Sequence, residues 1–181
     1  ADEIEFDLWQ TRDGVPVVMH DPTLERVSNG TGDITEKTLA ELKELDFGSK
    51  FNSAFAGLKI ATFEEVLKRF PRQAIFNIHI KSSGTDHIDR NYLRKIVQLI
   101  RDYDCLNHVY VTGRADLMEA MLEVAPEIPR CMGAGPDPSQ MDVVEKAIKY
   151  HIYLKKNNDS RNDNEISTCS GKNGDNKTHI L

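Results

Sequence analysis

Charged and apolar residues alternate along residues 3–8, and this short stretch limits how the chain folds more than any other. In an extended strand the apolar residues fall on one face, while the acidic residues, Glu5 and Asp7 among them, fall on the other. Asp13-Gly14 follows as a turn signal, and residues 15–19 form a short apolar run that suits a buried strand. The sequence therefore predicts two strands separated by a turn, with two carboxylates on one face of the first.

Patterns typical of strands and of helices alternate along the rest of the chain. Residues 21–55 are loop-rich, and the Thr-x-x-Glu starts of segments 38–45 and 62–70 fit the capping boxes of short helices. Periodicity further predicts strands at 74–81, 108–112 and 129–132 and helices at 89–102, 115–124 and 141–150. Such alternation predicts an α/β fold in which helices connect the strands of a parallel sheet.

Polar side chains stand at the ends of three successive predicted strands. Glu5 and Asp7 end the first strand, His20 ends the second, and His79 and Lys81 end the third. In a barrel of parallel strands these ends meet at the mouth of the active site. Two carboxylates two residues apart on one strand face can share a hard divalent cation. His20 is then a candidate general acid or base, and Lys81 a candidate partner for phosphate oxygens.

Each of these residues also has a purely structural interpretation. The acidic pair fits the solvent-facing side of an antiparallel strand. His20 fits a hydrogen-bonded structural residue, and His79 and Lys81 fit the solvent side of an edge strand. Residue spacing alone leaves these alternatives open.

Composition and charge narrow the function classes. A net charge of −6 argues against a nucleic-acid-binding protein, and no apolar run is long enough to span a bilayer. Cys105, Cys131 and Cys169 are odd in number and lack zinc-site spacing, so we expect interior thiols. The polar stretch at 151–181 has little to bury and is expected to be a disordered tail. We expect a soluble protein with a small-molecule substrate. The sequence fixes neither the oligomeric state nor the compartment, for which the cytoplasm is one candidate.

The motifs in this order resemble the glycerophosphodiester phosphodiesterase family. They are the strand Ile-Glu-x-Asp, the run Asp-Gly-x-Pro-Val-Val-x-His-Asp, a Gly-x-Gly loop and Thr-Leu-x-Glu-Leu, followed more loosely by "TFEEVLKRFP", "FNIHIK" and "AIKY". The resemblance covers about residues 1–150. It implies an incomplete TIM-type (β/α) barrel with a small insertion, about residues 21–57, after the His-Asp strand. It also implies metal-dependent hydrolysis of glycerophosphodiesters to glycerol 3-phosphate and an alcohol.

The resemblance assigns roles to the polar residues at the strand ends. Glu5 and Asp7 match the family's metal-binding carboxylates, His20 matches a catalytic histidine that protonates the leaving alcohol, and Lys81 matches a substrate-binding lysine that contacts the phosphate. His79 stands where the family has a third metal-binding carboxylate. If His79 is a ligand, the site should favour Mn²⁺, Co²⁺ or Zn²⁺ over the Mg²⁺ or Ca²⁺ that the family implies. If it is not a ligand, the metal site is crippled.

The chain also departs from the family pattern at both ends. The family's His-Arg pair lies upstream of Ala1, and the polar tail replaces the last strands expected after Tyr150, so the sequence resembles a truncated member. Two alternatives to the hydrolase therefore stay open. One is a degenerate, inactive member that binds metal or phosphodiester without turnover, and the other is a phospholipase-like activity on lysolipids.

Overall fold

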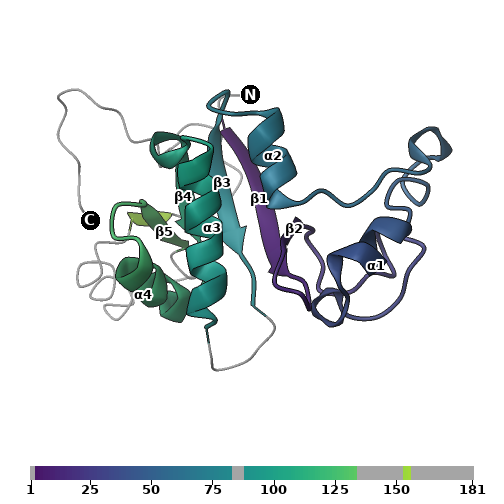
Figure 1. Ribbon diagram of the computed structural model, residues 1–181, viewed down its shortest axis with the longest axis horizontal. Coiled ribbons are helices and arrows are strands. Elements are labelled where there is room, and N and C mark those ends of the chain that lie inside the picture. Colours follow the sequence, from purple (N-terminus) through teal and green to yellow (C-terminus); the bar gives the residue numbers. More distant parts are fainter. Residues whose placement is uncertain (1–2, 83–87, 134–152, 156–181) are drawn as a thin grey trace, which may run out of the picture.

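The computed structural model describes residues 3–82, 88–133 and 153–155 (Figure 1). Within these residues the strands form one sheet in the order β2-β1-β3-β4-β5-β6. The strands are β1 Glu3–Gln10, β2 Pro16–Val18, β3 Ile75–Ile80, β4 Val109–Thr112, β5 Arg130–Gly133 and β6 Tyr153–Lys155. All neighbouring pairs run parallel except β1 and β2. The predicted parallel sheet is therefore confirmed from β1 onward.

The helices begin where the sequence predicts. They are α1 Leu39–Glu44, α2 Phe63–Arg69, α3 Arg90–Asp102 and α4 Ala115–Val124, and short 3-10 turns lie at Ile34–Glu36, Ser53–Phe55 and Leu106–His108. Both predicted capping boxes are present, at the starts of α1 and α2. In each, the threonine hydroxyl accepts from the amide three residues on while the glutamate accepts from the threonine amide, which satisfies two end groups of the helix. The predicted helix at 141–150 lies outside the described residues.

One apolar core lies between the sheet and three helices. The outward-facing residues of β1 and β3 pack against α2, α3 and α4, and α3 crosses in front of β3 and β4 in Figure 1. At the centre, the Phe6 ring lies 5.8 Å from Phe76 and 6.0 Å from Phe63, between ring centroids. A helical layer on one face, with polar residues of β1 and β3 on the other, is the arrangement of a (β/α) barrel wall.

A second core holds the insertion between β2 and α2. Trp9 and Val17 of the first two strands pack with Leu24, Ile34 and Leu42 of this segment. Figure 1 shows α1 and its loops to the right of β2, on the opposite side of the molecule from α4. The insertion therefore stands on its own apolar cluster beside the sheet.

The direction of β2 corrects one prediction. The sequence places His20 at the carboxyl end of a parallel strand, but β2 runs antiparallel to β1, with Trp9 opposite Val17. The cause is the tight turn before it, where Gly14 adopts a φ of +74° that favours glycine. The carboxylates Glu5 and Asp7 also lie within β1 rather than at its end, because the strand continues to Gln10.

Three further expectations have partial outcomes. Cys105 and Cys131 are buried thiols that form no disulfide among the described residues, as expected of interior cysteines, and Cys169 lies outside those residues. Strand β6 falls within the predicted tail and pairs with β5, while the rest of the tail is not described. Among the residues that the structure describes, no helix has the length and apolar character needed to cross a membrane.

The different burial of two phenylalanines predicts that their removal destabilises the protein to different extents. Phe76 is fully buried, whereas the Phe51 side chain is 84% exposed. We expect Phe76→Ala to lower the free energy of unfolding by about 3–5 kcal/mol, because it removes buried contacts and leaves a cavity. Phe51→Ala should change it by less than about 0.5 kcal/mol. Urea unfolding of both variants measures this, and similar losses would contradict the assigned core.

Candidate functional site

Two carboxylates and an imidazole meet on the face of the sheet opposite the helices. Glu5 and Asp7 come from β1, and His79 comes from β3, which pairs with β1 so that Asp7 lies directly opposite His79. One ligand atom from each residue can be chosen so that all lie within 4.8 Å of one another. Asp7 is buried, Glu5 is exposed and His79 is half-buried. Strand register alone therefore gathers three metal-ligating side chains.

Asp7 is the centre of this group. Its Oδ1 atom lies 2.9 Å from Nζ of Lys81 and 2.9 Å from Nδ1 of His79. Asp7 is 7% exposed and needs such partners, because burying an unpaired charge costs on the order of several kcal/mol of free energy. The cluster is thus not the solvated face of an antiparallel strand, which was one of the open interpretations.

The imidazole of His79 is held neutral by its surroundings. Burial is the largest cause that lowers its pKa, and the positive charge of Lys81 acts in the same direction. The carboxylate of Asp7 opposes both without overcoming them. A neutral imidazole has a lone pair to offer, which is the form that binds metals.

These donors fit a divalent cation. Carboxylate oxygens suit hard ions such as Mg²⁺, Ca²⁺ and Mn²⁺, and an imidazole nitrogen suits Zn²⁺, Co²⁺ and Mn²⁺ better than Ca²⁺. The nearby Lys81 lowers the net negative charge of the group, so it would weaken the attraction for any cation and at the same time attract an anion such as phosphate. The group therefore suits a metal and a phosphate together.

His20 lies on the chain that returns alongside β1. The amide of Met19 donates to the carbonyl of Asp7 over 3.2 Å, and Nε1 of Trp9 donates to the carbonyl of His20 over 3.3 Å. These bonds fix the backbone of the segment beside the acidic strand. The imidazole itself is 73% exposed, so solvent and ligands can reach it.

A carboxylate and a guanidinium orient His20. Nδ1 of His20 lies 2.8 Å from Oδ1 of Asp21, and Arg26 binds both carboxylate oxygens of Asp21, with 2.7 Å between Nη2 and Oδ1. Arg26 foremost, and His20 after it, hold the pKa of Asp21 well below its usual range. The ionised carboxylate accepts a hydrogen bond from Nδ1–H of His20, so Nε2 takes no part in this contact.

The structure thus unites most of the predicted site and adds two residues. Glu5, Asp7, His79 and Lys81 form one cluster, and His20 lies on the neighbouring hairpin. Sequence reasoning missed Asp21 and Arg26 as partners of the histidine. The signal was the His-Asp pair followed by an arginine five residues after the aspartate, which spans no helical or strand period.

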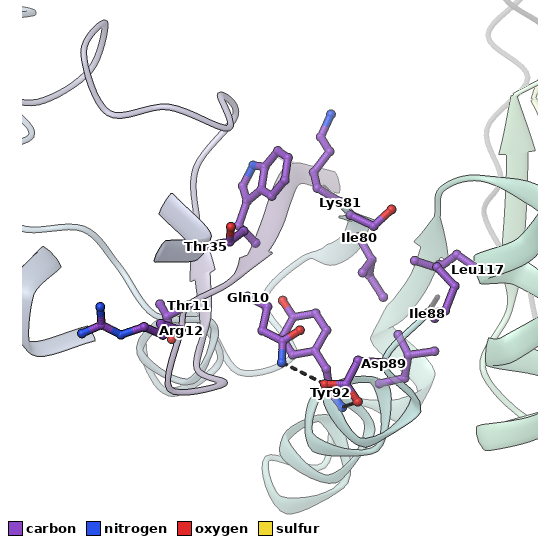
Figure 2. Close-up of a pocket in the computed structure, with 13 residues that line it drawn as sticks. Gln10, Thr11, Arg12, Thr35, Ile80, Lys81, Ile88, Asp89, Tyr92 and Leu117 are labelled. Atoms are coloured by element: carbon purple, nitrogen blue, oxygen red, sulfur yellow. Dashed lines mark hydrogen bonds between the residues drawn. The ribbon is translucent and has the colours of Figure 1, made fainter. Parts of the chain in front are cut away.

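A pocket of about 320 Å³ opens next to the cluster, at the ends of β1 and β3 (Figure 2). Lys81 and Trp9 contribute to its lining, whereas Glu5, Asp7, His79 and His20 do not. Lys81 therefore connects the two, because it lines the pocket and also contacts Asp7 of the metal-ligating group.

Comparison with known proteins matches this geometry to one family. Residues 1–160 match the sequence profile described as the Glycerophosphoryl diester phosphodiesterase family. The chain belongs to this family. A glycerophosphodiester phosphodiesterase of Bacillus subtilis is 47% identical over 93 residues, which is 47% of this chain and 32% of that protein. One from Caldanaerobacter subterraneus subsp. tengcongensis is 37% identical over 114 residues, 62% of this chain and 46% of that protein. The chain thus spans about a third to a half of the length of these family relatives.

Solved structures of the family share the fold. A phosphodiesterase from Oleispira antarctica in complex with the product sn-glycerol-3-phosphate has a TM-score of 0.73 at 22% identity, covering 86% of this chain and 63% of that chain. A glycerophosphodiester phosphodiesterase from Agrobacterium tumefaciens has a TM-score of 0.68 at 22% identity, covering 86% and 74%. The predicted incomplete TIM-type barrel is confirmed.

The surroundings of His79 predict how it titrates in metal-free protein. Its pKa should fall below the ordinary 6.5, and Lys81→Met should raise it because a neighbouring positive charge is removed. Since the pKa is lower in the folded than in the unfolded state, the stability that neutral His79 contributes is present above pH 6.5 and is lost as the pH falls through the lowered value.

Nuclear magnetic resonance of the imidazole carbon protons, with chelator present, measures this titration. Lys68→Met, which removes an exposed charge on α2, serves as the control and should leave the His79 pKa unchanged. A wild-type pKa above 6.5, or an equal change in both variants, would contradict the assigned environment.

Proposed function

We propose that the protein hydrolyses glycerophosphodiesters to glycerol 3-phosphate and an alcohol with the help of a divalent metal. The observation that carries this proposal is the cluster of Glu5, Asp7 and His79 with Lys81 beside it. Membership of the family supports it, as do relatives that carry this activity in their names. That a family structure holds sn-glycerol-3-phosphate agrees with the proposed product.

The proposed chemistry assigns one task to each part of the site. Water supplies the oxygen that bonds to phosphorus, and the bond between phosphorus and the alcohol oxygen breaks. The proton that the water loses passes to solvent, from which His20 is protonated again after each turnover. Protonated Nε2 of His20 gives its proton to the departing oxygen while Asp21 and Arg26 hold the ring. The ammonium of Lys81 has three donors, so it can contact a phosphate oxygen while it remains bonded to Asp7. A divalent cation held by Glu5, Asp7 and His79 would supply further positive charge to the phosphoryl group.

We also propose that the cation is Mn²⁺, Co²⁺ or Zn²⁺ rather than Mg²⁺ or Ca²⁺. The support is the imidazole of His79, a nitrogen donor that replaces one negative charge in the ligand set. Hard alkaline-earth ions prefer oxygen and charge, whereas later transition ions accept nitrogen readily. The lowered pKa of His79 helps, because protons then compete less with the metal for its imidazole.

A binding protein without turnover is the second candidate. One observation favours it: Oδ1 of Asp7 is already engaged by both His79 and Lys81, which together can satisfy the carboxylate without a metal. In that case Lys81 and His79 would hold a phosphodiester, and no metal would be required. Metal dependence of product formation separates the two candidates.

Hydrolysis of glycerophosphocholine should require both metal and His20. We expect His20→Ala to lower the rate by about 10²- to 10⁴-fold, the range usual for loss of a general acid, while metal affinity stays unchanged. Asp21→Asn should lower the rate less, and Asp104→Asn, a change of an exposed carboxylate that pairs with Arg72, should not affect it. Enzymatic detection of released glycerol 3-phosphate, with each metal and with chelator, measures this. Wild-type turnover unaffected by chelator, or undiminished in His20→Ala, would refute the proposed roles.

Substitution of His79 should change the metal preference. His79→Glu adds a charged oxygen ligand and should tighten Mg²⁺ and Ca²⁺ binding in calorimetric titrations. His79→Gln removes the imidazole without adding charge, so it should weaken Zn²⁺ binding and bring no gain for Mg²⁺. If His79→Glu brings no gain for either alkaline-earth ion, His79 is not a metal ligand.

A further inference from the structure

The pocket at the ends of β1 and β3 forms where these strands part. Near the end of β3, the amide of Lys81 donates to the carbonyl of Leu8 in β1 over 2.9 Å. Beyond it, Gln10 turns toward the start of α3 and donates to Oδ2 of Asp89 over 3.0 Å, the contact drawn as a dashed line in Figure 2. The fork between the strands therefore opens into the 320 Å³ pocket.

A buried hydroxyl without a partner lines this pocket. Tyr92 lies in the first turn of α3 and is 6% exposed, and its hydroxyl has no hydrogen-bond partner among the residues that the structure describes. In Figure 2 its ring rises from the helix toward the end of β1, among the residues that line the pocket. Leaving a buried hydroxyl unpaired costs about 1–3 kcal/mol, so a hydroxyl in this position is suited to meet a ligand.

The other lining groups define the chemistry that this pocket accepts. The side-chain amide of Gln10, whose nitrogen bonds to Asp89, contributes a carbonyl oxygen, and Ser82, two residues after β3, also lines the pocket. Apolar walls come from Ile80, Ile88, Leu93 and Leu117. A small ligand with an aliphatic backbone and one or more hydroxyl groups matches these surroundings.

Both cations that line this pocket are already paired, Arg12 with Glu41 and Lys81 with Asp7. The remaining charged group of the lining, Asp89, would repel an anion. The N-terminus of α3 would attract one, but Asp89 already caps it by accepting from the amides of Asn91 and Tyr92. Burial raises the pKa of Tyr92, so its hydroxyl stays protonated and both donates and accepts. A neutral alcohol meets these requirements, whereas the phosphate belongs on the side of Lys81.

We infer that the fork pocket is the subsite for the alcohol portion of the diester and that it selects an alcohol carrying a free hydroxyl, which bonds to Tyr92. This inference rests on the proposed function. Two lining residues connect the pocket to the proposed catalytic group. Nζ of Lys81 lies 2.9 Å from Oδ1 of Asp7. Nε1 of Trp9 donates to the carbonyl of His20. Figure 2 shows the Lys81 side chain pointing away from Tyr92, so the phosphate and the alcohol would occupy opposite sides of the fork.

The test compares two diesters on the full chain with His20→Ala, which prevents turnover, and with Mn²⁺ present. Glycerophosphoglycerol carries hydroxyls on both alcohols, and glycerol phosphomethyl ester carries only a methyl group on the second. Adding Tyr92→Phe should weaken the binding of glycerophosphoglycerol about twofold to tenfold, the loss of one hydrogen bond, and leave that of the methyl ester unchanged. Tyr103→Phe is the matched control, because the Tyr103 hydroxyl bonds to Glu64 on the surface. Equal effects on both diesters, or no effect on either, would overturn the inference.

A second measurement separates this inference from the proposed function. If neither diester binds, the proposed function fails, and free glycerol then tests the pocket by itself. Saturable shifts of the Gln10 side-chain amide and the Ser82 backbone amide in the resonance spectrum, weakened in Tyr92→Phe, would retain a hydroxyl-binding pocket. Their absence would overturn it. Tyr92→Phe should keep or raise the melting temperature, and a lower one would mean that the hydroxyl serves the fold instead.

Discussion

The buried charge of Asp7 is the interaction on which the arrangement depends. The Asp7 carboxylate is tolerated in a residue that is 7% exposed because His79 of β3 and Lys81, directly after β3, reach the same oxygen atom. This pairing requires the observed alignment of β1 with β3, because a slip of one residue would turn the polar row of the slipped strand into the helical core. The apolar face and the polar face of the two strands thus impose the same register, and that register creates the group of metal-ligating side chains.

The two faces of the sheet divide stability from chemistry. Phe6 and Ile78 pack under the helices, while Asp7 and His79, which follow them directly along each strand, face the other way. The antiparallel direction of β2 then brings a histidine alongside β1. It carries His20, held through Asp21, back along β1 toward the acidic residues. The hairpin of β1 and β2 therefore supplies both carboxylate ligands, Glu5 and Asp7, and leads directly into the proposed acid, His20.

Local sequence patterns predicted the helices and strands better than they predicted which side chains contact one another. The capping box at Thr62 and the bounds of α4 follow from spacing along one helix, so the sequence contained them. The direction of β2 depended on a glycine with positive φ, which a hydrophobic pattern does not record. The contact between Asp21 and Arg26 joins residues in a loop without periodicity. Tyr92 falls on the apolar face of α3, so its position in the sequence indicates a core residue, although it also lines the pocket.

The most direct test of the central claim is pulsed electron paramagnetic resonance on the chain loaded with Mn²⁺. The account predicts nitrogen modulation from one imidazole coordinated to the ion, retained in His20→Ala and lost in His79→Gln. It also predicts that Asp7→Asn abolishes the bound Mn²⁺ signal, because the buried carboxylate is central to the ligand set. Bound Mn²⁺ without nitrogen modulation, or modulation that persists in His79→Gln, would contradict the claim that the register of β1 and β3 builds the metal site.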